Sequence, residues 1–516
     1  MLDAIQRRWR GLALALALTA APLGFGAAAF AQDAAPAAAA AAEATPAAEA
    51  TQETTAEESA APGGVAAAGG EEAASEPAAP APDKGDTTWM LISTVLVLLM
   101  IIPGLALFYG GLVRSKNMLS VLMQVSTVTA IGMIAWVFWG YSLAFTDGGG
   151  LNSFIGGFSK AFLNGVTVTS NVETFSNGVV IPELVFVAFQ MTFACITAAL
   201  VLGAVAERIK FSAVVAFAVL WPLLSYYPMA HMVWWWAGAT SAFGQTAEEL
   251  AGGAGLIWAQ GALDFAGGTV VHINAGVAAL VACLILGPRE GYRREPMPPH
   301  SLTLTLVGAG LLWVGWFGFN AGSNLESNGY AALAMINTLV ATAAAGLSWV
   351  AVEWITRKRA SMLGLASGLI AGLVAVTPAA GFAGPVGAIV LGLIVSPICV
   401  VFCSTIKTAL KYDDSLDAFG IHAVGGIVGA IATGILVNPA LGGAGVVDFT
   451  NGSSGYDAGF QIMAQVKAVL IAVTWSAVAS AVVFLLIKFT LGLRVSRDTE
   501  EEGLDIVEHG ERAYHV

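Results

Sequence analysis

The chain has 516 residues, of which 57% are hydrophobic and only 11% are charged, and it contains 60 glycines. This composition excludes a soluble globular domain and a disordered chain, and it predicts a polytopic membrane protein. The net charge of −13 is mostly local, because residues 32–86 hold 11 acidic side chains against the single Lys84. The sequence has no basic stripe with interleaved aromatic residues, so nucleic acid is not expected as a partner.

The first 31 residues are typical of a secretory signal peptide. Arg7, Arg8 and Arg10 precede an apolar run over 12–30, and the small-x-small sequence A-F-A ends it at Ala31. This order of a basic region, an apolar region and a small-residue cleavage site predicts removal of 1–31, with the following residue outside the cytoplasm.

The next segment, 32–86, is composed of Ala, Pro, Glu and Thr with almost no large apolar side chains. Such a segment cannot bury enough apolar surface to offset the entropy of folding. It is predicted to be a disordered, acidic, extracytoplasmic arm.

From residue 87 to 492 the sequence predicts a membrane domain. Apolar windows near twenty residues alternate with short polar breaks, and each window can cross a hydrocarbon core about 30 Å thick. Eleven such windows are predicted, at 88–112, 118–144, 181–205, 212–235, 264–287, 301–322, 330–355, 362–379, 384–403, 418–437 and 462–491. The chain is therefore predicted to be an all-α polytopic membrane protein with eleven transmembrane helices.

The distribution of Lys and Arg supports this topology. With the N-terminus outside, the positive-inside rule expects basic residues in alternate loops. Most basic residues of the domain fall on the expected cytoplasmic side, and outside the signal peptide only Lys84, Lys160 and Lys467 fall on the other. Eleven spans then place the C-terminus inside.

Two stretches indicate an internal repeat of five plus five helices followed by one extra helix. H-I-N-A-G begins at His272 in the fifth window, and H-A-V-G-G begins at His422 in the tenth, with each histidine four residues before a glycine. F-Y-G-G-L at 108–112 has a looser echo in W-F-G-F-N-A-G at 316–322. Because five is odd, the second repeat must be inverted relative to the first, so that the two histidines approach each other near mid-membrane.

An ionisable side chain inside a membrane usually faces a cavity or a partner. A single histidine could simply join two helices by hydrogen bonds, but two at repeat-related positions favour a pair that lines a pore. Neutral imidazoles can share one proton and still donate to, or accept from, a small hydride such as ammonia. Two histidines without a third ligand make a poor metal site, and no cofactor is expected.

Asp264 stands ahead of G-G-T at the outer end of the fifth window. One interpretation is structural, since a carboxylate there can cap the helix and meet its positive dipole end. The other is that its charge favours a cation arriving from outside. The two roles are compatible.

Aromatic residues gather at the outer ends of several windows. Phe189 and Phe193 share a helix face, Phe319 and Ser323 are four apart in the sixth window, and tryptophans occupy 234–236. Packing and the interfacial aromatic belt explain such residues in most membrane proteins. A hydroxyl with convergent aromatic faces would, however, suit a small dehydrated cation through a hydrogen bond and cation–π attraction.

Several stretches resemble the signatures of the ammonium transporter family (Amt/Mep/Rh), over roughly residue 87 to the C-terminus. They are F-Q-M-T-F-A-C-I-T (189–197), A-E-R-I-K-F (206–211), H-M-V-W (231–234), D-F-A-G-G-T-V-V-H-I-N-A-G (264–276), G-W-F-G-F-N-A-G-S (315–323) and D-A-F-G-I-H (417–422). The resemblance implies a transporter and not an enzyme, a homotrimer with one pore per subunit, and a bacterial inner membrane location.

The resemblance also implies roles for single residues. Trp234 and Ser323 would form the outer ammonium site with Phe189 beside it, and Phe193 and Phe319 would be the gate. His272 and His422 would be the twin histidines, and Asp264 the acid that supports recruitment or deprotonation. This chain departs from the pattern in its long outer loop at 235–263, which leaves open which of the tryptophans 234–236 faces the mouth.

The cytoplasmic tail at 493–516 is charged, which taken alone predicts a solvated segment. Its E-G-L-D and H-G-E-x-A-Y elements resemble the regulatory tail of bacterial family members, which implies contact with a neighbouring subunit and with a PII-type nitrogen-signalling protein. Two alternatives to a transporter remain, namely an ammonium sensor that signals through its tail and a neutral-gas channel of the Rh type. The 24 residues after Gly492 are too few for a fused signalling domain.

Overall fold

The structure is a computed structural model that describes residues 80–514. In this part of the chain, eleven helical spans are long and apolar enough to cross a membrane, which confirms the predicted number. They are Lys84–Leu112, Ser115–Phe145, Glu183–Val205, Phe211–Trp234, Gly268–Leu286, Leu302–Gly322, Gly329–Arg357, Met362–Ala379, Pro385–Leu410, Phe419–Leu436 and Ala458–Thr490. The predicted signal peptide and most of the predicted arm lie outside the described residues.

Several spans contain a short π-helical segment between two α-helices or at their start. The first span consists of α2 (Lys84–Leu99), the π-helical η2 (Met100–Leu105) and α3 (Ala106–Leu112), and the second of the 3-10 turn η3 (Ser115–Asn117), α4 (Met118–Ala135), the π-helical η4 (Trp136–Gly140) and α5 (Tyr141–Phe145). The third span is α6 (Glu183–Val205). The fourth consists of α7 (Phe211–Trp221), the π-helical η7 (Pro222–Tyr226) and α8 (Tyr227–Trp234), and the fifth of the π-helical η8 (Gly268–Ile273) and α12 (Asn274–Leu286). The remaining spans are α13 (Leu302–Gly322); α14 (Gly329–Arg357); α15 (Met362–Val376) with the 3-10 turn η9 (Thr377–Ala379); α16 (Pro385–Val400), the π-helical η10 (Val401–Ile406) and α17 (Lys407–Leu410); the π-helical η11 (Phe419–Ala423) and α18 (Val424–Leu436); and α19 (Ala458–Thr490).

The span boundaries differ from the predicted windows where capping chemistry decides them. The first span begins at Lys84 and not at 88, because the Asp83 carboxylate accepts hydrogen bonds from the amides of Gly85 and Asp86. The fifth span begins at Gly268 and not at 264, and the ninth continues to Leu410 beyond the predicted 403.

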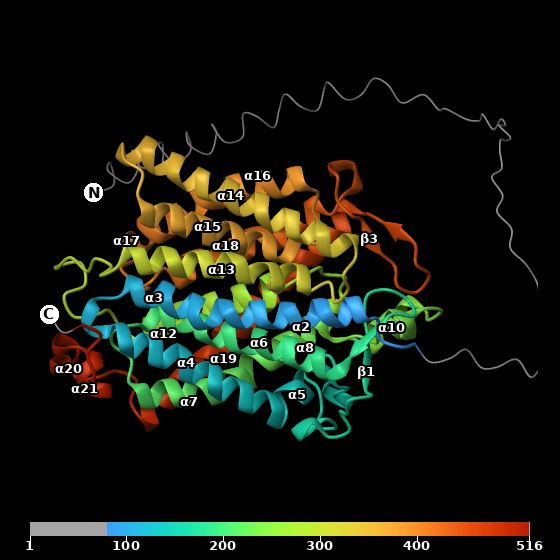
Figure 1. The fold of residues 1–516 in the computed structure, drawn as a ribbon, viewed down its shortest axis with the longest axis horizontal. Coiled ribbons are helices and arrows are strands. Elements are labelled where there is room, and N and C mark those ends of the chain that lie inside the picture. The colour runs from blue at the N-terminus through green and yellow to red at the C-terminus, as the bar shows by residue number, and fades with distance from the viewer. Residues whose placement is uncertain (1–79, 515–516) are drawn as a thin grey trace, which may run out of the picture. The chain divides into compact units, whose positions relative to one another are not determined.

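The spans run side by side, with connecting structure at both ends (Figure 1). One end carries the strand pair β1 (Asn171–Glu173) with β2 (Val180–Pro182), the pair β3 (Val446–Val447) with β4 (Ser454–Gly455), and the short helices α9 (Ala239–Ala242), α10 (Ala247–Gly252) and α11 (Leu256–Ala259). The opposite end carries α17 and the tail helices α20 (Arg497–Glu502) and α21 (Leu504–His509). We call these the hairpin end and the tail end.

The two sequence halves occupy different sides of the bundle. In Figure 1 the helices α14, α15 and α16 lie along one side, and α4, α5 and α7 lie along the other. Helix α13 packs against α2 and α3, so the first spans of the two predicted repeats are in contact. Because successive spans alternate in direction, α2 and α13 run antiparallel, as an inverted repeat requires.

Candidate functional site

A cavity of about 570 Å³ opens at the hairpin end, and we call it the vestibule. Its aromatic walls include Trp234, Trp235, Trp236 and Trp258, and Ser323 lines it as well. Four acidic residues also line it, namely Asp147, Glu173, Asp264 and Glu326. The structure therefore brings together most of the residues expected at the outer site, in a setting that suits a cation.

Trp234 connects the vestibule to the phenylalanine side chains below. Its indole N–H donates to the Asp264 carbonyl oxygen at 3.0 Å, and its ring lies edge-on to Phe193 with centroids 5.9 Å apart. Trp235 instead stacks on His231, and Trp236 stacks on Trp258. All three tryptophans line the vestibule, but these contacts single out Trp234 as the one beside the predicted gate.

The three predicted phenylalanines form a packed column and are fully buried. The rings of Phe193 and Phe319 are stacked, with centroids 4.2 Å apart and planes 21° apart. Phe189 contacts Phe193 at 4.9 Å but does not line the vestibule itself. Nothing as large as a hydrated ion passes between rings at these separations.

Ser323 ends α13 at the vestibule. Its hydroxyl donates to the carbonyl oxygen of Phe319 at 2.8 Å. With the hydrogen engaged, the hydroxyl oxygen offers its lone pairs to the cavity, so Ser323 is disposed to accept a hydrogen bond from an N–H donor.

His272 and His422 lie face to face, as the repeat predicted. Their Nδ1 atoms are 3.3 Å apart, and the rings are inclined by 23°. Since two neutral imidazoles bond through Nδ1 only if one carries the proton, the pair shares a single Nδ1 hydrogen. The His272 Nε2 atom is buried and has no hydrogen-bond partner among the described residues.

The histidine pair continues the aromatic column. The His272 ring lies 6.0 Å from Phe319 and 5.4 Å from Trp316. A cavity of about 10 Å³, roughly the room for one water-sized molecule, is lined by both histidines and by Phe319. The order from the hairpin end inward is therefore Trp234, Phe193, Phe319, His272 and His422.

The glycine four residues after each histidine explains why the pair can meet. A side-chain carbon at Gly276 would lie 2.2 Å from the backbone nitrogen of Ala423, which follows His422. One at Gly426 would lie 3.1 Å from the Cβ atom of His272. The absence of a side chain at both positions lets the fifth and tenth spans cross in backbone contact.

Asp264 caps the fifth span. Its carboxylate accepts hydrogen bonds of 2.6–3.2 Å from the amides of Gly267, Gly268, Thr269 and Val270. Burial raises the pKa of Asp264, and these four hydrogen bonds oppose the rise. The Asp264 carboxylate therefore caps the start of the fifth span and lies at the wall of the vestibule.

The sequence reasoning missed the counterpart of Asp264 in the second repeat. Asp414 precedes His422 by eight residues, as Asp264 precedes His272, and its carboxylate accepts from the amides of Ala418 and Phe419. Burial raises the pKa of Asp414 to about 6, with Lys407 opposing the rise. The shared spacing of eight residues was the signal that could have found it.

Sequence and structure comparisons agree with this geometry. The pattern of the Ammonium Transporter Family matches residues 88–514. An ammonium transporter of Bacillus subtilis is 43% identical over 430 residues, which are 83% of this chain and 98% of that protein. One of Aquifex aeolicus is 42% identical over 435 residues, which are 84% of this chain and 94% of that protein.

The chain belongs to the ammonium transporter family. This is a family of transporters, so the function of the chain is the transport of ammonium across a membrane. The Mep2 crystal structure of Saccharomyces cerevisiae superposes with a TM-score of 0.68 at 31% identity, covering 81% of this chain and 91% of Mep2. A structure described as a sensor Amt protein superposes with a TM-score of 0.71 at 28% identity, covering 82% of this chain and 98% of that one.

The tail of this family member is folded, which corrects the prediction from its charge. Glu500, Leu504 and Asp505 are buried at the tail end, and the Asp505 carboxylate accepts from the amides of Leu119 and Ser120 at the start of α4. The tail therefore packs on the membrane domain of its own chain. The buried Leu504 side chain and the buried Asp505 carboxylate hold the tail against the membrane domain, so this part of the tail is not solvated.

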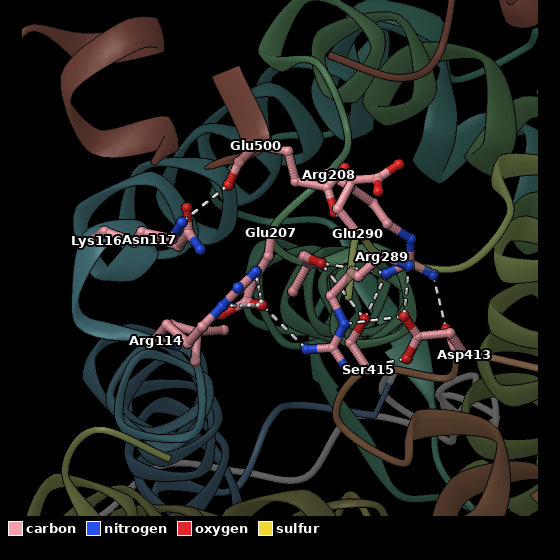
Figure 2. Close-up of polar contacts among 12 residues, drawn as sticks. Arg114, Lys116, Asn117, Glu207, Arg208, Arg289, Glu290, Asp413, Ser415 and Glu500 are labelled. Carbon is pink, nitrogen blue, oxygen red and sulfur yellow. Dashed lines mark hydrogen bonds and ion pairs between the residues drawn. The ribbon is translucent and has the colours of Figure 1, made fainter. Parts of the chain in front are cut away.

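Buried ion pairs join the loops next to the tail (Figure 2). Arg289 binds Glu207 at 3.0 Å and Asp413 at 2.9 Å, and Arg114 binds Glu207 at 2.8 Å. Burial alone would raise the pKa of Glu207, but Arg289 and Arg114 hold it below its usual value. The same is true of Asp413, where Arg289 and Arg208 oppose burial. Four loops distant in sequence are thus joined by charge pairs.

The described residues, 80–514, contain neither a cluster of side chains that could bind a metal ion nor a disulfide. Within residues 80–514 no group of three or more His, Cys, Asp and Glu side chains could hold a metal ion. The four cysteines in this range are unpaired, and three of them are buried.

Proposed function

We propose that the chain takes up ammonium by deprotonating it at the vestibule and conducting ammonia through the twin-histidine pore, with the proton transferred separately. Ammonium would bind between the Trp234 ring and the Ser323 hydroxyl, with Phe189 beside the site. The observation that carries the proposal is the unbroken column from Trp234 through the stacked phenylalanines to two imidazoles 3.3 Å apart.

The outer site can replace the hydration shell of a small cation. The Ser323 oxygen accepts one N–H, and the aromatic faces attract the charge. A cation with no proton to lose would still meet the buried phenyl column as an ion. Potassium is therefore rejected because it cannot become neutral, whereas ammonium can.

The phenylalanine gate and the histidine pair then act on ammonia. Phe193 and Phe319 must separate by a ring movement to admit a molecule of that size. Beyond them, His272 and His422 offer nitrogen donors and acceptors in surroundings that are otherwise apolar. The proton released by ammonium passes to water in the vestibule and crosses by a route separate from the ammonia, so net transfer is electrogenic.

Asp264 supports this step through position and charge. Its four amide hydrogen bonds fix the start of the fifth span, and its carbonyl fixes the Trp234 indole. Both carboxylate oxygens of Asp264 accept hydrogen bonds from backbone amides. We therefore favour a role of Asp264 in supporting the cation site over a role as the base that takes the proton from ammonium.

Assembly and location are part of the same proposal. We expect a homotrimer with one pore per subunit in a bacterial inner membrane, serving nitrogen uptake, with the hairpin end outside. A PII-type protein is expected to bind at the tail end, where the folded tail and the basic loops form the surface.

The test is an ammonium concentration jump on a solid-supported membrane that carries the purified protein. The parent protein is expected to give a saturable current that potassium does not evoke. His272→Ala and His422→Ala are each expected to abolish this current or to convert it into a potassium-permeable leak. A Phe489→Ala variant, whose side chain is exposed on α19, serves as the control and should behave like the parent.

A parent protein that binds ammonium but gives no current would contradict the mechanism. Binding without flux would favour an ammonium sensor, and ammonia flux without charge movement would favour a neutral-gas channel. Because a structurally similar protein is described as a sensor, ammonium binding and ammonium current should both be measured on the same preparation.

A further inference from the structure

Glu326 has an unusual environment in the vestibule wall. It lies in the turn between α13 and α14, and only 6% of the residue is exposed. Its Oε2 atom accepts from the Ser176 hydroxyl and the Asn328 amide, each at 2.8 Å. Its Oε1 atom is buried and has no hydrogen-bond partner among the described residues. A carboxylate oxygen in this state lacks the compensation that burial of a charge requires.

The other acidic residues of the vestibule are engaged differently. Asp264 is bonded to four amides, as described above. Glu173 accepts from the amides of Thr240 and Ser241 and from the Ser241 hydroxyl. Asp147 is exposed and accepts from the amide of Gly149. Of the four acids, Glu326 is the one that combines burial with an unpartnered oxygen.

No protein cation neutralises Glu326 in the described part of the chain. The basic residue that lines the vestibule, Lys160, forms its ion pair with Glu183. No ion pair within residues 80–514 includes Glu326. Buried charges in proteins are usually paired, so a mobile cation in the vestibule is the natural partner.

A second acceptor lines the same cavity. Gln190 follows Phe189 on α6, is 8% exposed, and has a buried Oε1 atom with no partner among the described residues. It adds a neutral acceptor to the wall that already contains the Glu326 carboxylate. Both oxygens lack a donor among the described residues, and both belong to side chains that line the cavity.

We infer that Glu326 is the anionic ligand of a second cation position in the vestibule, outside the Trp234–Ser323 site, that holds ammonium before it is deprotonated. This inference rests on the proposed function. One carboxylate with neutral acceptors compensates a single positive charge, and no cluster of three acidic, His or Cys groups is present for a divalent ion in residues 80–514. A small rotation of the Glu326 side chain, which lines the cavity, would bring Oε1 to the N–H groups of ammonium. The site would raise the local ammonium concentration and lower the concentration that half-saturates transport.

The test is the dependence of the ammonium-evoked current on ammonium chloride concentration in Glu326→Gln. Glutamine keeps an oxygen for Ser176 and removes the charge. The half-saturating concentration is expected to rise at least about tenfold, because a hydrogen bond to a charged group is lost, while the maximal current stays near that of the parent. The shift should persist when N-methylglucamine chloride raises the ionic strength, since the site is buried.

Matched controls separate a ligand from a general electrostatic effect. Asp147→Asn and Glu173→Gln each remove one negative charge from the same vestibule. If the charge acted only through its field, all three variants would shift alike and added salt would remove the shift. That result, or an unchanged half-saturating concentration in Glu326→Gln, would overturn the inference.

Binding of a cation at Glu326 can also be measured by crystallography, without a transport assay. Crystals of the parent protein soaked in thallium(I) acetate, a monovalent cation close to ammonium in size, are expected to show an anomalous peak beside the Glu326 Oε1 atom. Glu326→Gln crystals should lack it. A peak-free vestibule in the parent would mean that water alone meets Oε1 and would overturn the site. A parent protein without ammonium current would instead defeat the proposed function, and the thallium peak would still decide the site.

Discussion

Individual polar atoms determine where a cation could be stabilised between the vestibule and the histidine pair. At the vestibule, the Ser323 oxygen and the acidic side chains provide acceptors beside aromatic faces. Deeper in the protein, the polar groups next to the phenylalanine column are the two imidazoles, which share one hydrogen between their Nδ1 atoms. Along the proposed pathway, the surroundings therefore change within a few side chains from acidic and aromatic groups that would favour a cation to apolar groups that would favour a neutral molecule.

Asp264 allows a prediction at this scale. In Asp264→Asn the side-chain NH₂ group would face two of the four backbone N–H donors and leave them unsatisfied. The free energy of unfolding is expected to fall by at least about 2 kcal/mol, because each buried unsatisfied donor costs about 1–3 kcal/mol. Thermal unfolding in detergent measures the change. Asp147→Asn, at an exposed position, should change stability by less than about 0.5 kcal/mol, and an equal loss in both would contradict the capping role.

The crossing of the fifth and tenth spans shows how an element positions the histidines. The helices η8 with α12 and η11 with α18 each carry a histidine followed after four residues by a glycine. Gly276 contacts the backbone beside His422, and Gly426 contacts His272. The repeated spacing therefore has a steric cause, because each histidine can approach the other helix only where that helix has no side chain.

Gly276→Ala tests this crossing. Its new methyl group would overlap the backbone nitrogen of Ala423, so the helices must separate and the Nδ1 atoms must move apart. We expect loss of the ammonium current and a stability loss of about 1–3 kcal/mol. Gly310→Ala is the matched control, because nothing lies within 4 Å of the added carbon on α13, and it should be neutral or stabilising by up to about 1 kcal/mol. Equal behaviour of the two variants would show that the crossing tolerates a side chain.

The loops of the tail end form a second structural unit. Asp413→Asn would leave Arg289 with Glu207 as its remaining acidic partner in a buried site. Loss of one partner of a buried ion pair destabilises a protein by about 3–5 kcal/mol, so thermal unfolding at pH 7 should show a large decrease. The exposed Glu511→Gln in the tail is the control.

The effect of Asp413→Asn should depend on pH with a definite sign. The ion pairs hold the pKa of Asp413 below its usual value, so its carboxylate contributes stability above the usual carboxyl range. That contribution is lost as the pH falls through the depressed pKa. The difference in stability between parent and variant is therefore expected to shrink below about pH 4. A difference that grows at acid pH would contradict the assigned charge state.

At the scale of the whole molecule, two ends of different chemistry are joined by apolar helices. The hairpin end holds the vestibule with its acids and aromatic residues. The tail end holds the folded tail (Figure 1) and the arginine network (Figure 2). Many large apolar side chains on the spans are exposed in the single chain, as contact with lipid requires. A cation would enter where negative groups gather, and regulation would act where the tail binds.

Cysteine labelling tests the orientation of these two ends. Val168 lies 88% exposed at the hairpin end, and Arg359 is exposed in the loop after α14. With the hairpin end outside, a membrane-impermeant maleimide added to intact cells should label Val168→Cys and leave Arg359→Cys unlabelled until the membrane is opened. The parent protein is the control, since three of its four cysteines are buried. The reverse labelling pattern would invert the proposed topology.

The number of spans and most of their ends could be predicted from the amino-acid sequence alone, as could the meeting of the two histidines. Apolar windows separated by polar breaks report local chemistry, because a helix that crosses a membrane must be apolar along its own length. The histidine and glycine spacing was visible for the same reason. Its repetition predicted that His272 and His422 would meet, and they do.

Which side chains line the same cavity became clear from the three-dimensional packing. Trp234 contacts Phe193 of the predicted gate while Trp235 and Trp236 stack elsewhere, and Phe189 does not line the vestibule. The same packing brings Glu326 into the vestibule wall with one oxygen unpartnered, and it places a charged tail against the membrane domain. These outcomes depend on contacts between residues far apart in the chain, where packing and hydrogen bonding outweigh the preferences that a residue shows among its sequence neighbours.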